Sequence, residues 1–159
     1  MRRLLKFLHT IGAIGLMGSM ACLLVLLNFV PPSTSLAEYA SFRAAMGSIA
    51  TWIVYPSLGL ALVSGLLAIA CNRGYHGAGW AWAKAVSGVL LFESGFVGVI
   101  GPMQLEAKRS AAALAGKADP AILAASLPAE RNTLLILLGL AAFNVAFGIW
   151  RPRLTRLRD

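Results

Sequence analysis

Charged residues are scarce in this sequence. Asp, Glu, Lys and Arg make up only 13% of its 159 residues, whereas 58% of the residues are hydrophobic. A soluble globular domain typically carries about 25% charged residues. The low charge content therefore excludes an ordinary soluble domain and predicts a chain that lies in a lipid bilayer.

Acidic residues are the scarcer of the two signs, because the chain has 14 Lys and Arg but only 6 Asp and Glu, for a net charge of +8. This basic excess does not indicate a nucleic-acid partner. The basic residues gather at the ends of apolar segments, and they form neither a stripe nor a patch interleaved with aromatic residues. Such a distribution is typical of residues that set membrane topology.

Cysteine and histidine are also few. Cys22 and Cys71 lie inside or at the end of apolar segments, which is not the pattern of a disulfide framework or of a metal site. The histidines are His9 and His76 alone. The sequence also lacks a Gly-rich phosphate loop, a Cys-x-x-Cys pair, a His-Glu-x-x-His motif and a serine elbow. No motif of a soluble enzyme is therefore present.

Long apolar runs are what the chain has instead. They cover roughly residues 4–30, 46–71, 80–102 and 132–150. Each run approaches or exceeds the ~20 residues of a membrane-spanning helix, and none shows the alternating polarity of a membrane strand. The stretches VPPSTS, NRGYHGAG and IGPMQ separate the runs. The sequence predicts an all-α integral membrane four-helix bundle, with residues 1–159 as a single transmembrane domain.

The segment 103–131, between the third and fourth runs, is rich in alanine. We expect it to form one or two short surface helices on the outer face of the membrane. Pro120 suits the start of a helix, and Pro128 suits a stop.

Basic residues also predict the orientation of the bundle. Four spans place both chain ends on one side of the membrane, and the residues on that side carry almost no acid. The basic residues there are Arg2, Arg3, Lys6, Arg73, Arg151, Arg153, Arg156 and Arg158. The other loops hold Arg43, Lys108, Arg109, Lys117 and Arg131, balanced by Glu38, Glu106, Asp119 and Glu130. The positive-inside rule then makes both termini cytoplasmic.

Small residues recur at helical spacing in three of the runs. They are Gly12, Gly15 and Ser19 in the first, Ser57, Ala61 and Gly65 in the second, and Gly88, Gly95 and Gly98 in the third. Helices in a bilayer associate through close backbone approach and a few polar contacts. These stripes therefore predict the contact faces of a compact bundle.

His9 and Lys84 lie at similar depths in the first and third runs, near the side that carries the termini. One interpretation is that His9 stays neutral with a backbone or water partner, while Lys84 extends to the lipid headgroups. The other is that His9 is an axial ligand to a haem iron and that Lys84 pairs with a propionate or another anion. His76 lies in the NRGYHGAG turn and is expected to be solvated, so a haem here would have a single histidine ligand.

Glu93 lies near the middle of the third run. It is nine residues from Lys84, about 180° around a helix, so the two side chains should point to opposite faces. We expect Glu93 to be protonated and bonded to another helix, or to face a polar cavity or a partner subunit; proton transfer is the functional alternative. Asn144 is expected to donate a hydrogen bond between helices. Tyr55, directly before Pro56, is expected to be an interfacial anchor at a helix kink.

Two stretches resemble a known family. LLKFLHTIGAIGLMG resembles the first helix of the small four-helix membrane proteins that include the HemJ-type protoporphyrinogen oxidases and the CopD-like domain. WAWAKAVSGVLLF resembles the third helix of the HemJ-type proteins, in which a lysine follows a tryptophan. The resemblance implies that His9 binds haem and that Lys84 is required for activity.

The chain also departs from that family. HemJ-type proteins follow the first-helix histidine with a Tyr-Leu-Pro-Arg segment and a further histidine, where this sequence reads MACLLVLLNFVPPS. The GPM and IWRPRL stretches are similar to a group of bacterial four-helix proteins of similar size, which implies no activity.

Two functions follow as expectations. The first is a b-type haem-binding redox protein of the bacterial inner membrane, related to the HemJ-type oxidases and acting on a porphyrin or a quinone. In it, haem b is bound by His9 and Lys84, and the candidate catalytic residues are Lys84 and Glu93. The alternative is a non-enzymatic accessory or scaffold subunit, which forms a homo-oligomer or joins a larger membrane complex through its small-residue faces and Glu93.

Overall fold

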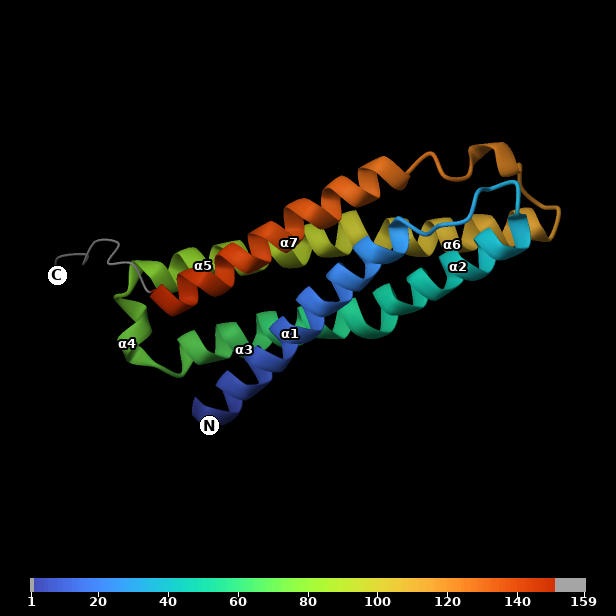
Figure 1. Ribbon diagram of the computed structural model, residues 1–159. Coiled ribbons are helices and arrows are strands. Elements are labelled where there is room, and N and C mark those ends of the chain that lie inside the picture. Colours follow the sequence, from blue (N-terminus) through green and yellow to red (C-terminus); the bar gives the residue numbers. More distant parts are fainter. Residues whose placement is uncertain (1, 151–159) are drawn as a thin grey trace.

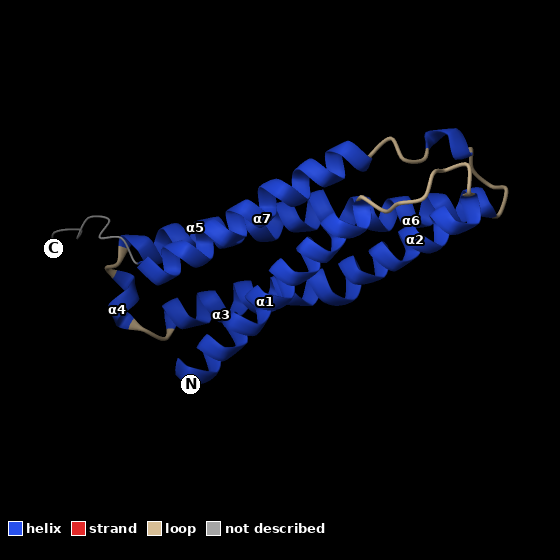
Figure 2. Cartoon of the chain, viewed as in Figure 1, coloured by secondary structure: helices blue, strands red, loops and turns tan. Residues whose placement is uncertain are grey.

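The computed structural model describes residues 2–150, and the regular structure of this part of the chain is helical, without strands (Figures 1 and 2). Four helical stretches are long and apolar enough to cross a membrane: Arg3–Leu27, Leu36–Ala70, Gly79–Leu114 and Pro120–Trp150. The predicted class, an all-α protein with four membrane spans, is confirmed.

Two of the four stretches are rods assembled from several helical elements. The first rod joins α2 (Leu36–Ile49), η1 (Ala50–Val54) and α3 (Tyr55–Ala70). The second rod joins α5 (Gly79–Gly95), η2 (Phe96–Ile100) and α6 (Gly101–Leu114). The remaining elements are α1 (Arg2–Leu27), the short α4 (Arg73–His76), the single turn η3 (Pro120–Ile122) and α7 (Leu127–Trp150).

Each rod contains a wide π-helical turn just before a proline. The η1 turn precedes Pro56, and the η2 turn precedes Pro102. A proline inside a helix lacks an N–H and collides with the carbonyl four residues earlier, and a local widening of the helix accommodates it. The two wide turns contact each other. Tyr55, expected at a kink, directly follows one of them.

These turns correct the predicted ends of the second and third helices. Gly101 and Pro102 do not end the third helix, which continues to Leu114, and the second helix begins at Leu36 instead of 46. The extensions α2 and α6 are stable because they pack against each other. In the segment 103–131, where one or two short helices were expected, the residues up to Leu114 belong to α6 and Pro120–Ile122 form the η3 turn.

The two prolines of that segment have different outcomes. Pro120 begins η3, as predicted. The prediction that Pro128 stops a helix is wrong, because Pro128 is the second residue of α7. A proline in the first helical turn loses no hydrogen bond, since the N–H groups there have no partner within the helix.

Four helices surround the axis of the bundle at one end. There α1 packs on α3 and α7, and α5 packs on the same two helices. The start of α1, α4 and the end of α7 lie together at this end, whereas α2 and α6 extend to the opposite end (Figure 1). The placement of the two chain termini relative to a membrane stays a prediction, because residues 1 and 151–159 lie outside the described part of the chain.

Small residues form the contact between α1 and α3, as the stripes predicted. A side chain at Gly12 would bring its Cβ within 2.7 Å of the Ala61 backbone nitrogen, and Gly15 lies directly against Ser57. On α5, a Cβ at Gly95 would lie 2.8 Å from the Leu58 side chain. On η2, a Cβ at Gly98 would lie 2.8 Å from the Thr133 side chain. The helices therefore approach each other closely.

Candidate functional site

A partly enclosed cavity of about 240 Å³ lies between α1, α3, α5 and α7, at the end of the bundle where the chain begins. Along α1 it extends from Leu5 to Met17, which at 1.5 Å per residue is a depth of about 18 Å. The deep wall is apolar and is formed by Leu16, Leu58, Leu91 and Ala141. Polar and charged side chains in the wall are Lys6, His9, Tyr75, Lys84 and Asn144.

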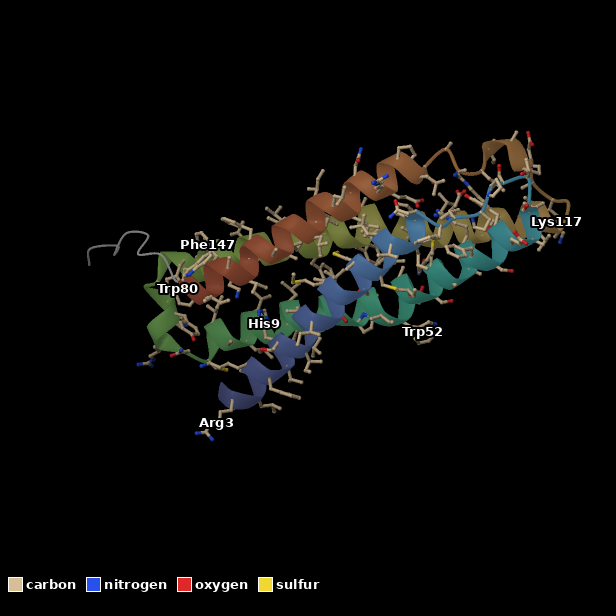
Figure 3. All side chains as sticks on the ribbon, viewed as in Figure 1. Arg3, His9, Trp52, Trp80, Lys117 and Phe147 are labelled. Atoms are coloured by element: carbon tan, nitrogen blue, oxygen red, sulfur yellow. The ribbon has the colours of Figure 1, made fainter. Side chains whose placement is uncertain are left out.

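The imidazole of His9 is fixed by α3. Its Nδ1 lies 2.8 Å from the carbonyl oxygen of Ala61, and its Cε1 lies 3.3 Å from the position that a Cβ would take at Gly65. Glycine at position 65 therefore makes room for the ring. Figure 3 shows His9 where α1 runs beside α3. A carbonyl oxygen can only accept a hydrogen bond, so Nδ1 carries the proton.

In the neutral ring, the other nitrogen of His9, Nε2, then has a lone pair. Nε2 makes no hydrogen bond within residues 2–150. Unlike Arg43 Nε, which is fully buried without a partner, Nε2 is not fully buried. Since His9 lines the cavity, Nε2 is accessible to a ligand. A neutral imidazole nitrogen in this state can bind a metal ion or accept a hydrogen bond.

Lys84 enters the same cavity from α5. Its side chain is partly buried, and its ammonium group packs against the backbone of Gly148 on α7. It is also close enough to His9 to act on the imidazole electrostatically. The structure therefore brings His9 and Lys84, expected at a common level, into the wall of one cavity.

Asn144 connects two walls of the cavity. Its Nδ2 donates a 2.6 Å hydrogen bond from α7 to the Ser87 hydroxyl on α5. The predicted hydrogen bond between helices is confirmed. Because this bond joins α5 to α7 beside the cavity, it also holds the cavity's shape.

Two aromatic rings lie at the end of the cavity nearest α4. Tyr75 of α4 and Trp80 of α5 form an edge-to-face pair with centroids 5.4 Å apart, and both line the cavity. Sequence reasoning did not select Tyr75, although its place in the turn before Trp80 was a usable signal. His76, expected to be solvated, is exposed, and its Nε2 lies 3.1 Å from the carbonyl oxygen of Ile69.

Glu93 is outside the cavity. It is exposed on the outer surface of α5, and its carboxyl makes no hydrogen bond or ion pair within residues 2–150. Lys84 and Glu93 thus point to opposite faces of α5, as their spacing predicted. Of the environments expected for Glu93, a bond to another helix and a polar cavity are not found in the described part of the chain. Its role as a proton carrier stays a prediction.

A buried ion pair at the opposite end of the molecule was missed by sequence reasoning. Arg43 donates to both carboxylate oxygens of Glu130, at 2.8 and 2.6 Å, and Ser126 donates to the same carboxylate. Beside it, the Tyr39 hydroxyl donates to Glu106 at 2.7 Å. Of these residues, Arg43, Glu106 and Glu130 had been counted among the charges of the outer loops. Their only sequence signal was the balance of acid and base in the outer loops.

This polar cluster is fully packed. The side chains of Arg43 and Glu130 are 0% and 2% exposed, and the cavity does not reach them. Among residues 2–150, no group of three or more His, Cys, Asp or Glu side chains could hold a metal ion. The cluster therefore joins α2, α6 and α7, and the cavity beside His9 is the candidate site.

Fold and site together define a multi-pass helical membrane protein with a cavity inside its bundle. Comparison with protein-family models, curated proteins and solved structures finds no match for this chain. The relationship to HemJ-type and CopD-like proteins stays a prediction from two sequence motifs.

Proposed function

We propose that this protein binds b-type haem in the cavity between α1, α3, α5 and α7 and acts as a redox protein of the bacterial inner membrane, with cytoplasmic termini. One observation carries the proposal. The His9 ring is fixed through Nδ1 by the Ala61 carbonyl, while Nε2 is accessible in an apolar cavity.

The residues of the cavity suit haem chemically. A histidine that ligates a metal almost always donates its other ring N–H to a carbonyl or carboxylate, which fixes its tautomer and orientation. The apolar walls suit a macrocycle, and Lys6 and Lys84 suit its anionic propionates. The volume of about 240 Å³ is below the ~300–1,000 Å³ of typical ligand sites, so the helices would have to separate to hold the whole ring.

Each wall residue has a role in this proposal. His9 would hold the haem iron through Nε2, Lys84 would pair with an anionic group, and Asn144 keeps α5 and α7 in register through Ser87. When bound, haem supplies one-electron chemistry. We propose a porphyrin or a quinone as the redox partner, since the walls of the cavity are largely apolar.

The test is an absorption spectrum of the detergent-purified protein, as isolated and after titration with haemin. We expect a Soret band that is lost in His9→Asn. Asparagine keeps a donor near the position of Nδ1 but cannot replace the imidazole as a ligand, so this variant separates ligation from folding. His76→Asn, at the exposed histidine of α4, is the matched control and should keep the band.

Two results would contradict the proposal. They are a protein that stays colourless after titration, and a His9→Asn variant with the spectrum of the unchanged protein. A second candidate function, a non-enzymatic subunit of a larger complex, is supported by the exposed carboxyl of Glu93. A colourless protein that copurifies with a larger assembly would favour it.

A further inference from the structure

The outer surface of α5 and η2 carries an apolar stripe with one carboxyl at its centre. Val86, Leu90 and Val97 are 60%, 55% and 69% exposed, and Glu93 lies between Leu90 and Val97 on the same side of the helix. The spacing of four, three and four residues keeps these side chains on one helical face. We call these four residues the Glu93 stripe.

Glu93 lies deep in the apolar part of its rod. Residues 85–105, between Lys84 and Glu106, contain no other ionisable side chain. The carboxyl is also without a hydrogen-bond partner in the described part of the chain. A carboxyl in hydrocarbon is costly unless it is neutral and hydrogen-bonded. A partner from outside the chain would therefore stabilise it.

We propose that a second copy of this protein docks on the Glu93 stripe, with the two protonated Glu93 side chains hydrogen-bonded to each other. A protonated carboxyl both donates and accepts, so it complements an identical group. Two copies with the same orientation in a membrane are related by a two-fold axis along the membrane normal. Such an axis brings the same residue of each copy to the same depth.

The surface beside the stripe allows close approach of two helices. Ser94 and Gly101 are both exposed and lie one heptad apart next to Glu93 and Val97. Small residues at this spacing let helix backbones come near each other in a bilayer. The cavity lies on the opposite face of α5, where Lys84 points, so the contact does not obstruct it. The inference is thus independent of haem binding.

Disulfide trapping tests the position of the interface. In a Cys22→Ala/Cys71→Ala background, reconstituted in phosphatidylethanolamine and phosphatidylglycerol vesicles, Val97→Cys is expected to give covalent dimers on mild oxidation. Ile14→Cys is the matched control, because Ile14 is 64% exposed on α1, which is not in the stripe. Dimers from Ile14→Cys and none from Val97→Cys would overturn the proposal.

Energy transfer between labelled copies in the same vesicles tests the carboxyl pair. Glu93→Gln keeps a donor and an acceptor and should associate like the unchanged protein. Glu93→Leu should weaken association about tenfold, since it removes a hydrogen bond between helices. Equal association of Glu93→Leu and the unchanged protein would overturn the proposal, as would a chain that stays monomeric or binds only a different protein through this stripe. None of these readouts depends on haem.

Discussion

At the scale of single residues, the two ends of the bundle use polar side chains differently. The end that holds the cavity leaves the Nε2 atom of His9 accessible. The opposite end pairs Arg43 with Glu130 in a contact that excludes solvent. Removing one member of a buried pair leaves the other charge without compensation, whereas replacing both by apolar residues is often tolerated. This difference separates the candidate site from a structural contact.

Glu130→Leu is therefore expected to destabilise the protein by roughly 3–5 kcal/mol, because Arg43 would remain buried and unpaired. The double variant Arg43→Leu/Glu130→Leu should recover a large part of that loss. The measurement is reversible unfolding in bicelles by titration with a denaturing detergent. Lys108→Leu, at an exposed position of α6, is the control. A double variant less stable than Glu130→Leu would contradict this account of the pair.

Sequence reasoning selected the polar residues at the cavity end of the bundle and missed the ion pair at the opposite end. His9 and Lys84 stand out because an ionisable residue in an apolar run has no ordinary explanation. Arg43 and Glu130 are in segments of mixed polarity, where exposed charges are common. Their burial depends on a contact between residues 87 positions apart, and nothing in the local pattern of either segment reveals that contact.

At the scale of helical elements, the contact of α1 with α3 depends on glycine. The backbone of α3 occupies the space of a side chain at Gly12, whereas a Cβ at Gly18 of the same helix would meet nothing within 4 Å. Gly12→Ala should cost roughly 1–3 kcal/mol through overpacking. Gly18→Ala should be neutral or stabilise by up to about 1 kcal/mol, because alanine favours helix.

The same bicelle titration measures both variants. The His9 side chain should respond as well. His9 belongs to α1, and its hydrogen-bond partner, the Ala61 carbonyl, belongs to the part of α3 that Gly12 contacts. If the cavity binds haem as proposed, that binding should weaken in Gly12→Ala and stay unchanged in Gly18→Ala. Equal stability of the two variants would show that the contact between α1 and α3 is not tightly packed.

Hydrophobicity predicted the number of long apolar helical stretches correctly, but not where the helices end. An apolar run marks the part of a helix that lies in lipid, and α2 and α6 continue beyond it as a more polar pair. The proline signal at Pro102 was misleading, because a wide turn lets the helix continue through it. The hydrophobicity pattern therefore could not predict helix ends that depend on packing outside the apolar runs.

At the scale of the whole molecule, the rods are longer than a bilayer is thick. The rod Leu36–Ala70 has 35 residues, about 52 Å at 1.5 Å per residue, whereas the hydrocarbon core is about 30 Å thick. Part of each rod therefore lies outside the hydrocarbon core. The charged residues of α2, α6 and the start of α7 place that part at the end opposite the cavity. The buried cluster of Arg43 and Glu130 stabilises it there.

The orientation of this arrangement can be tested with thiol labelling. Cys71 is exposed where α3 ends beside α4, and Lys117 is exposed just beyond α6, at the opposite end. If the basic end is cytoplasmic, a membrane-impermeant maleimide should modify Cys71 in inverted vesicles and not in intact cells. Lys117→Cys, in a background without the native cysteines, should show the reverse pattern.

Cys22 provides the internal control, because it is exposed on α1 within the apolar span. A thiol surrounded by lipid meets no water-soluble reagent, so a variant with Cys22 alone should stay unmodified from both sides. Labelling of Cys71 in intact cells, together with protection of Lys117→Cys, would reverse the orientation. The cavity of His9 and Lys84 would then open toward the outer face, and any haem or redox partner would have to reach it from that side.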